Sequence, residues 1–335
     1  CIVPSAGWGY NSLNGPDWSH PMVDVPWHLY NEYGDINVLR QNYKALKAHV
    51  SYISSMANDY IASYGLGDWC APFEGAAISI NMESFKCPVP VSDTAYFHSA
   101  VKMAQKCAAL LGFEEDEKAY ADLAQKVKQA FRNEFFDKAT YTVKGDCQSA
   151  TAMMIFHGLA EEDEIPHLLE KLLSQIERDN GHLDFGVLGC KAVMESLGRY
   201  GYAENAMKLL TNPTYPSMKH WLNMGTTTLL ECWNGGGSRN HHMFSCVSAF
   251  FYKYVAGISA AAPAYRKIDF RPAIESSLTR AHASVNTPYG KAECGFEKKD
   301  GKTIVNITVP SSCKGTLYIG EKAIEYSAGR YTVEI

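Results

Sequence analysis

Apolar residues recur every three or four positions along most of the chain. The clearest stripe consists of Leu39, Tyr43, Leu46, Val50, Ile53, Met56 and Tyr60. Because an α-helix turns once in 3.6 residues, these side chains share one face, and the stripe predicts a long amphipathic helix over 36–62. Similar patterns predict helices over 94–112, 116–136, 147–159, 163–178, 186–199, 202–210 and 241–257. A shorter helix is expected before residue 35 and another around 226–231.

The pattern changes near residue 260. Beyond that point, the segments 267–272, 303–309 and 315–319 alternate apolar and polar residues with period two, and turn signals such as Asp300-Gly301 separate them. Alternation of this kind is typical of half-buried β-strands. The sequence therefore predicts a helical domain over 1–260 and a small antiparallel β-sandwich domain over 261–335.

Composition and charge narrow the class of partner. The chain of 335 residues has 46% hydrophobic and 20% charged residues and a formal net charge of −5. A negative balance does not attract nucleic acid or an anionic membrane over long range, so neutral substrates fit better. No run of about 18 apolar residues predicts a membrane span. No signal peptide is evident at the start, and both a cytoplasmic and a periplasmic location in a bacterium agree with the sequence.

Cysteine usage gives no sign of a metal or redox cofactor. The ten cysteines are scattered singly, without a C-x-x-C pair or a His/Cys cluster at zinc spacing. We interpret them as reduced structural thiols. No nucleotide-binding motif occurs either, because the three glycines at 235–237 follow no strand and precede no Lys-Ser/Thr. The sequence predicts no cofactor and no metal.

One carboxylate stands in an unusual setting. Glu231 follows two leucines, precedes Cys232 and Trp233, and is succeeded by the three glycines and by His241-His242. An acid between apolar residues and an indole is placed where its basicity can be tuned by a partly dry surrounding. Glu231 is therefore the first candidate for a catalytic residue.

The tryptophans suggest a carbohydrate ligand. All six lie in the helical part, and four of them, Trp8, Trp18, Trp69 and Trp233, stand beside Gly, Asp, Asn or Ser residues in segments read as loops or helix starts. Indole faces flanked by polar groups can stack on the C–H face of a sugar while hydrogen bonds hold its hydroxyls. The alternative is that these rings fill the top of a helical barrel.

Several ordered motifs resemble those of the bacterial α-L-rhamnosidases of glycoside hydrolase family 78. The segment Gly67-Asp68-Trp69-Cys70-Ala71-Pro72 is similar to their Gly-Asp-Trp-Leu-Ala-Pro loop, and 226–233 to their Ala-Thr-Thr-Leu-Trp-Glu-x-Trp. Further similarities extend over the whole chain and lie at 15–18, 25–35, 182–189, 214–218, 238–244, 254–258 and 270–272.

The resemblance implies an (α/α)6 barrel that hydrolyses a terminal α-L-rhamnosyl bond with inversion. Glu231 matches the general base. His241 matches an imidazole that binds a sugar hydroxyl, and Asp68 a second hydroxyl ligand. Trp69 and Trp233 match apolar walls beside the methyl group of the deoxysugar.

The chain also departs from the family pattern. The general acid of these enzymes lies upstream in an Asp-Cys-Pro-x-Arg-Glu-Arg-x-Gly-Trp stretch, which these residues lack. The patterns predict nine or ten helices where a closed barrel needs twelve. We therefore expect a mainly α fold, an incomplete (α/α)6-type helical toroid, before the β-sandwich. Where relatives read Trp-Gly-Asp-Ala, this chain reads Trp18-Ser19-His20-Pro21, which places His20 in the expected pocket beside Asp17 and Trp18.

Two interpretations stay open at this point. The chain is either a fragment whose missing helices come from elsewhere, or a short variant that binds carbohydrate without hydrolysing it or acts by another chemistry. An incomplete barrel exposes apolar helix faces, which favours a homo-oligomer or complementation by the missing helices. Candidates for a substitute acid are Asp17, Asp68, Glu74 and Asp184, although each also suits a helix cap or a turn.

Overall fold

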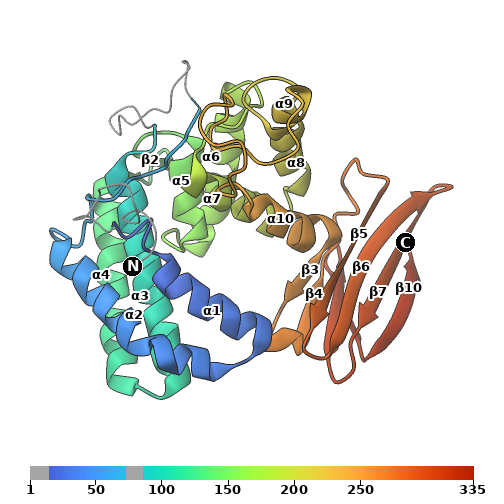
Figure 1. Cartoon of the computed structure of the whole chain (residues 1–335), viewed down its shortest axis with the longest axis horizontal. Helices are drawn as coiled ribbons and strands as arrows, with labels where there is room; N and C mark the ends of the chain where they lie inside the picture. Colours follow the sequence, from blue (N-terminus) through green and yellow to red (C-terminus); the bar gives the residue numbers. More distant parts are fainter. Residues whose placement is uncertain (1–14, 73–85) are drawn as a thin grey trace. The chain divides into compact units, whose positions relative to one another are not determined.

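The computed structural model of the chain describes residues 15–72 and 86–335 (Figure 1). The described residues form two compact units, each assembled from segments that are separate in the sequence. The first unit contains residues 15–26, 39–72, 86–196 and 208–245. The second contains 27–38, 197–207 and 246–335.

Helices account for nearly all regular structure before residue 257. They are α1 (Pro21–Tyr33), α2 (Ile36–Met56), α3 (Val89–Leu111), α4 (Glu114–Phe135), α5 (Gln148–Phe156), α6 (Ile165–Arg178), α7 (Val187–Arg199), α8 (Ala203–Thr211), α9 (Met218–Asn223) and α10 (Cys246–Phe250). A 3-10 turn, η2 (Glu162–Glu164), precedes α6, and a π-helical turn, η3 (Phe251–Ala256), follows α10. Two short strands, β1 (Phe136–Asp137) and β2 (Thr142–Val143), form a hairpin after α4.

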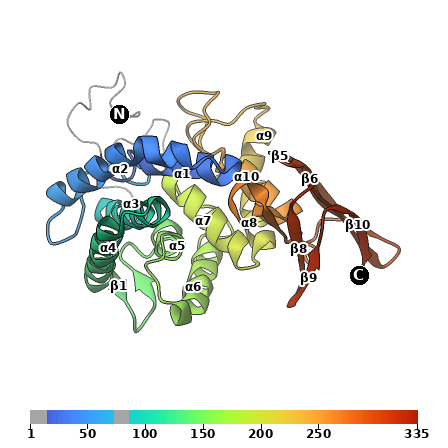
Figure 2. The same ribbon diagram turned by 90° about the horizontal axis from the view of Figure 1, so that it is seen from below.

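The stripe predicted for the second helix forms the buried face of α2. Leu39, Leu46 and Ile53 are each at most 2% exposed. The helix ends at Met56, which is 42% exposed, so the predicted extension to residue 62 was wrong. Antiparallel α3 and α4 lie side by side in both views (Figures 1 and 2), joined by a turn at Gly112 with φ 78°. In this left-handed conformation glycine caps a helix without Cβ strain.

Two predicted helices differ from the structure where the candidate site begins. Residues 226–231 are not helical but part of an irregular loop, and the helix expected over 241–257 starts only at Cys246. Leu230 is nevertheless fully buried, at 0% exposed. The apolar run therefore anchors a loop, which sequence periodicity alone does not distinguish from a short buried helix.

The predicted β-sandwich is present in the second unit. One sheet has the order β10-β7-β6-β5 and the other β3-β4-β8-β9. The strands are β3 (Ile258–Ala260), β4 (Lys267–Phe270), β5 (Arg280–Thr287), β6 (Gly290–Lys299), β7 (Lys302–Val309), β8 (Lys314–Ile319), β9 (Lys322–Tyr326) and β10 (Gly329–Glu334). A 3-10 turn, η4 (Pro263–Tyr265), separates β3 from β4. Pairing is antiparallel except between β4 and β8, which run parallel.

The sandwich core lies between the two sheets and combines Phe270 and Leu317 with Phe296 and Val305, each at most 3% exposed. Buried residues alternate along the strands, as Ile268 and Phe270 do on β4 and Val305, Ile307 and Val309 do on β7, which is the period of two that the sequence predicts. Among the described helices, none is long and apolar enough to cross a bilayer.

Candidate active site

Asp17 joins two loops from inside the first unit. Its side chain is 2% exposed, and its Oδ1 and Oδ2 accept hydrogen bonds from the Trp18 and Gly67 backbone N–H groups, both at 2.7 Å. The Trp18 indole N–H also donates to the Gly67 carbonyl at 3.3 Å. These bonds fasten the segment 15–20 to the segment 65–70 and leave the Trp18 ring half-buried.

A second carboxyl group, that of Asp93 on α3, faces Asp17. Asp93 is 0% exposed, and its Oδ2 accepts the backbone N–H groups of Tyr64 at 2.8 Å and Gly65 at 2.6 Å. A Cβ atom on Gly65 would lie 2.3 Å from Asp93 Oδ1 and 2.4 Å from Asp17 Oδ1. Only glycine fits between the two carboxyl groups.

The hydrogen-bond pattern decides which of the two acids carries a proton. Both oxygens of Asp17 accept backbone N–H groups, whereas Asp93 Oδ1 receives no backbone donor. Burial raises the pKa of both groups, and the neighbouring charge of Asp17 raises the pKa of Asp93 further. Two carboxylates this close cannot both ionise. We infer that Asp93 is the protonated partner and that Oδ1, which accepts no hydrogen bond, is the oxygen that carries the proton beside Asp17.

Asp68 is committed to the start of α7. Its Oδ1 accepts the Gly189 N–H at 2.8 Å, and its Oδ2 accepts the Gly186 N–H at 2.9 Å and the Ser149 hydroxyl at 2.5 Å. The side chain is 2% exposed, and burial raises its pKa. Backbone donors at a helix N-terminus favour a carboxylate. Asp68 thus fixes its own loop against α7, and Val187 N–H donates to the Trp69 carbonyl at 2.9 Å beside it.

We expect Asp68→Asn to lower the free energy of unfolding by about 2 to 3 kcal/mol. The asparagine has only one acceptor oxygen, so its N–H₂ group faces at least one backbone N–H, and that N–H loses its acceptor. Ser149→Ala removes one donor, keeps both backbone bonds and is expected to cost about 1 kcal/mol. Urea denaturation measures both values, with Asp163→Asn as the exposed control. Equal stability of Asp68→Asn and the control would contradict the assigned role.

Glu231 lies on a loop closed by backbone hydrogen bonds. Its own N–H donates to the Ser238 carbonyl at 2.9 Å, and its Oε2 accepts the Ser238 N–H at 2.6 Å. A Cβ on Gly237 would come within 2.6 Å of Oε2, so glycine is needed at this close approach. The side chain is half-buried. The loop therefore presents a carboxylate, and a backbone hydrogen bond fixes one of its two oxygens.

Trp233 is an interior residue that supports this loop. It is 1% exposed, and its indole N–H donates to the Phe185 carbonyl at 2.9 Å. Its ring stacks on Trp221 with centroids 4.6 Å apart and packs against Phe244 at 4.4 Å. Protein atoms cover the ring faces, so the arrangement suits a support for Glu231 better than a wall that contacts sugar.

Two cysteines bring the Asp68 loop and the Glu231 loop together. Cys70 Sγ lies 3.8 Å from Cys232 Sγ, and both residues are buried. Each follows a predicted site residue, Trp69 in one loop and Glu231 in the other. The half-buried Trp69 and the half-buried Glu231 therefore belong to adjoining segments.

His241 lies at the far end of the Glu231 loop. Its backbone N–H donates to the Leu229 carbonyl at 2.9 Å, and its Nδ1 accepts the Met243 N–H at 3.4 Å. Because Nδ1 acts as an acceptor, the neutral ring carries its hydrogen on Nε2. The half-buried ring lies parallel to that of His242, with centroids 5.9 Å apart.

His20 is placed differently from the other candidates. It is 3% exposed, and its Nε2 lies 3.3 Å from both Asp24 Oδ1 and Ser99 Oγ. The ring packs edge-on to Tyr96, with centroids 5.0 Å apart. Asp24 is also paired with Lys191 at 2.9 Å, and its interactions with His20 and Lys191 hold its pKa well below the usual range against the effect of burial. His20 is thus part of a buried polar cluster.

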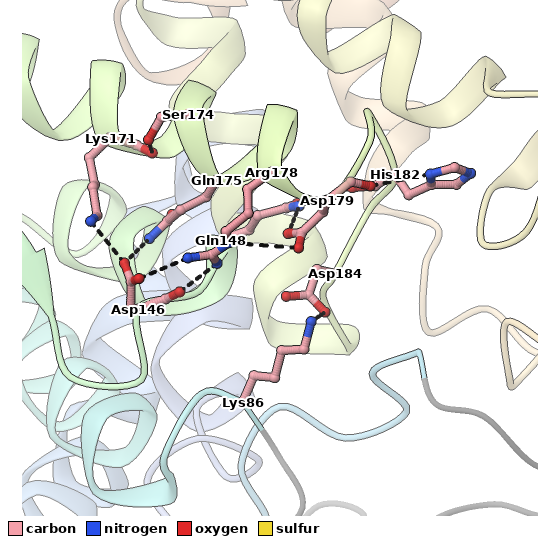
Figure 3. A network of polar contacts seen from close by, with 10 residues as sticks. All are labelled: Lys86, Asp146, Gln148, Lys171, Ser174, Gln175, Arg178, Asp179, His182 and Asp184. Atoms are coloured by element: carbon pink, nitrogen blue, oxygen red, sulfur yellow. Dashed lines mark hydrogen bonds and ion pairs between the residues drawn. The ribbon is translucent and has the colours of Figure 1, made fainter.

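The candidates for a substitute acid are occupied elsewhere or lie outside the described residues. Asp184 is 7% exposed and pairs with Lys86 Nζ at 2.7 Å, next to a polar network at the end of α6 (Figure 3). Burial raises the pKa of Asp184 to about 6, although Lys86 opposes the shift. Asp17 and Asp68 are committed to backbone donors. Glu74 and Trp8 lie outside the described residues.

Sequence reasoning missed the partners that hold the candidate loops. Asp93 and Ser149 are separated from their contacts by 28 and 81 residues. A signal existed for Asp93, since it stands between Val91 and Ala95 on the apolar face of a helix, where an unpaired acid is costly. Within 15–72 and 86–335, no cluster of three or more His, Cys, Asp or Glu side chains is arranged to hold a metal ion.

Helical hairpins that bring such loops together, followed by a β-sandwich, are the architecture of a helical-hairpin glycosidase domain. Residues 1–255 match the family described as the bacterial alpha-L-rhamnosidase 6 hairpin glycosidase domain, and 257–333 match the bacterial alpha-L-rhamnosidase C-terminal domain. The chain belongs to the bacterial α-L-rhamnosidases, and the resemblance seen in the sequence is confirmed.

Individual relatives agree with this assignment. An alpha-L-rhamnosidase from Alteromonas sp. (strain LOR) is 30% identical over 92% of this chain. The structure of an alpha-L-rhamnosidase from Dictyoglumus thermophilum is 31% identical over 96% of the chain, with a TM-score of 0.85. A Streptomyces avermitilis alpha-L-rhamnosidase complexed with L-rhamnose shares the fold, with a TM-score of 0.85 at 24% identity. The chain spans 35% of the Alteromonas protein and 39% of the Dictyoglumus chain.

Proposed function

We propose that the chain contributes the general-base side of an α-L-rhamnosidase active site and that the protein removes terminal α-L-rhamnose by inverting hydrolysis. The observation that carries the proposal is the position of Glu231 in a chain of this family. Its loop holds one carboxylate oxygen by the Ser238 N–H and lies against the loop that presents Trp69.

In this reaction Glu231 accepts the proton of the attacking water. The Ser238 N–H fixes Oε2 and orients the carboxylate, and we assign Oε1 to the water. As the water oxygen bonds to the anomeric carbon on one face of the ring, the bond to the leaving oxygen breaks on the other. An inverting enzyme needs a general acid on that side, with the two carboxyl groups about 6.5 to 9.5 Å apart. Asp17, Asp68 and Asp93 do not suit that role, because the backbone or a partner acid engages their oxygens.

The remaining candidates take supporting or binding roles in the proposal. His241 donates its Nε2–H to a sugar hydroxyl, and the half-buried indoles of Trp18 and Trp69 contact the apolar C–H face of the sugar. Trp233 holds the Glu231 loop, and Asp68 and Asp17 position the loops that carry Trp69 and Trp18.

A time course of hydrolysis followed by proton NMR tests the proposal. The protein at its natural length is incubated with an aryl α-L-rhamnoside, and an aryl β-D-glucoside serves as the control substrate. We expect β-L-rhamnose to appear first and the α-anomer only after mutarotation, because a single displacement inverts the anomeric centre. Initial release of the α-anomer would contradict inversion. Absence of both turnover and rhamnose binding would contradict the function itself.

A further inference from the structure

Cys70 and Cys232 are placed for a reaction with each other. Their sulfur atoms are 3.8 Å apart, and a disulfide bond is about 2.05 Å long, so a closure of about 1.8 Å forms the bond. Both residues lie in irregular segments rather than inside helices or strands. Small shifts of two loops therefore suffice, and no regular element has to break.

The pair is also chemically asymmetric. Either sulfur can donate its S–H to the other at this distance, and the sulfur that accepts this bond is the more acidic of the two. A thiolate is the nucleophile in cysteine oxidation. The accepting sulfur is thus the attacking one, and its partner is the resolving one. The exposed fractions, 3% for Cys232 and 5% for Cys70, favour a small oxidant over a bulky one.

We propose that Cys70 and Cys232 are a peroxide-sensitive dithiol whose oxidation to a disulfide switches off the Glu231 site. The effect on activity rests on the function proposed above, whereas the oxidation itself does not. The thiolate of the accepting sulfur attacks one oxygen of hydrogen peroxide, which breaks the O–O bond and gives a sulfenic acid and hydroxide. The partner sulfur then displaces the second hydroxide and forms the S–S bond. In sum, two thiols and one peroxide give one disulfide and two water molecules.

The disulfide changes the site because it ties the residue after Trp69 to the residue after Glu231. A closure of about 1.8 Å shifts the two loops relative to each other. A misplacement of about 1 Å can lower a rate about 100-fold. We therefore expect a large and reversible loss of turnover on oxidation, with restoration by dithiothreitol.

The test combines peptide mapping with kinetics on the protein at its natural length. After treatment with hydrogen peroxide, mass spectrometry is expected to find one cross-linked peptide pair that contains Cys70 and Cys232 and has lost two hydrogen atoms. Turnover of an aryl α-L-rhamnoside is expected to fall at least tenfold and to recover with dithiothreitol. Cys70→Ser and Cys232→Ser should each keep their own untreated rate after peroxide, whereas Cys107→Ser, a buried cysteine on α3, should respond like the wild type.

Each outcome decides a separate part of the proposal. A cross-link confined to another pair, such as Cys87 with Cys147, or no cross-link at all, would overturn the dithiol. A Cys70–Cys232 cross-link without loss of turnover would overturn the switch. If the untreated protein has no rhamnosidase activity, the proposed function fails, and peptide mapping of the wild type still decides whether the dithiol forms. The same mapping serves if the serine variants do not fold.

Discussion

Asp17→Asn is expected to destabilise the protein by about 2 kcal/mol at pH 8, whereas Asp93→Asn is expected to stabilise it by about 1 kcal/mol. The two substitutions are chemically identical and change two carboxyl groups that face each other across Gly65. Asp17 accepts the Trp18 and Gly67 N–H groups, so an amide in its place leaves one backbone donor without an acceptor.

The opposite expectation for Asp93 follows from its hydrogen bonds. An asparagine carbonyl at the place of Oδ2 still accepts the Tyr64 and Gly65 N–H groups. Its amide N–H₂ at the place of Oδ1 can donate to Asp17, as we infer for the acid proton of the wild type. The variant keeps every bond and no longer has to bind a proton in order to fold.

The sign of the pH dependence distinguishes this account from a general effect on packing. The pKa of Asp93 is raised well above 3.8 in the folded protein, so its contribution to stability is complete below about pH 4 and is lost as the pH rises through the raised value. His49 and His98 act in the opposite sense. Burial lowers the pKa of each from 6.5 to about 4, and their contribution is lost as the pH falls below about 6.5.

Urea denaturation of the wild type and both variants at pH 5 and pH 8 isolates the carboxyl pair, because the histidines contribute equally to all three proteins. The stability gained by Asp93→Asn over the wild type should be larger at pH 8 than at pH 5. If Asp93→Asn is the less stable of the two variants at pH 8, the assignment of the proton to Asp93 is wrong.

Local periodicity predicted the fold well, because helices and strands bury one face with a fixed period. The stripe that begins at Leu39 became the buried face of α2, and the alternation after residue 260 became the sandwich core. The prediction was wrong at 226–231, where Leu230 is fully buried in a loop. Bonds between distant residues of the loop, such as His241 N–H to the Leu229 carbonyl, replace the local helical ladder there.

The candidate residues were found more readily than their roles. A sequence shows that Asp68 stands beside Trp69, but not that its oxygens accept bonds from residues 81 to 121 positions away. Likewise, the residues beside Trp233 in the sequence suggested that it lines a pocket, whereas the structure buries it between Trp221 and Phe244. Contacts across such separations depend on tertiary packing and leave no local pattern.

Glu231→Gln is expected to lower kcat for an aryl α-L-rhamnoside by about 1,000-fold, since a positioned general base contributes roughly 100- to 10,000-fold. Glutamine has nearly the same shape, and its amide oxygen can accept the Ser238 N–H that Oε2 accepts in the wild type. The loop should therefore keep its conformation, while the amide cannot take a proton from water. KM should stay within about threefold of the wild-type value, because binding of the sugar does not need the base.

A matched control separates loss of the base from loss of a charge. Glu170 lies on α6 with a side chain that is 76% exposed, and Glu170→Gln removes the same charge far from any candidate loop residue in the sequence. Both variants should have the urea midpoint of the wild type. A lower midpoint in Glu231→Gln alone would assign its effect to folding.

The most direct test of the account is kcat for the aryl α-L-rhamnoside, measured on the wild type, Glu231→Gln and Glu170→Gln at one pH with the protein at its natural length. We predict that kcat falls about 1,000-fold in Glu231→Gln and is unchanged in Glu170→Gln. A folded Glu231→Gln variant whose kcat lies within about tenfold of the wild-type value would contradict the assignment of Glu231 as the general base.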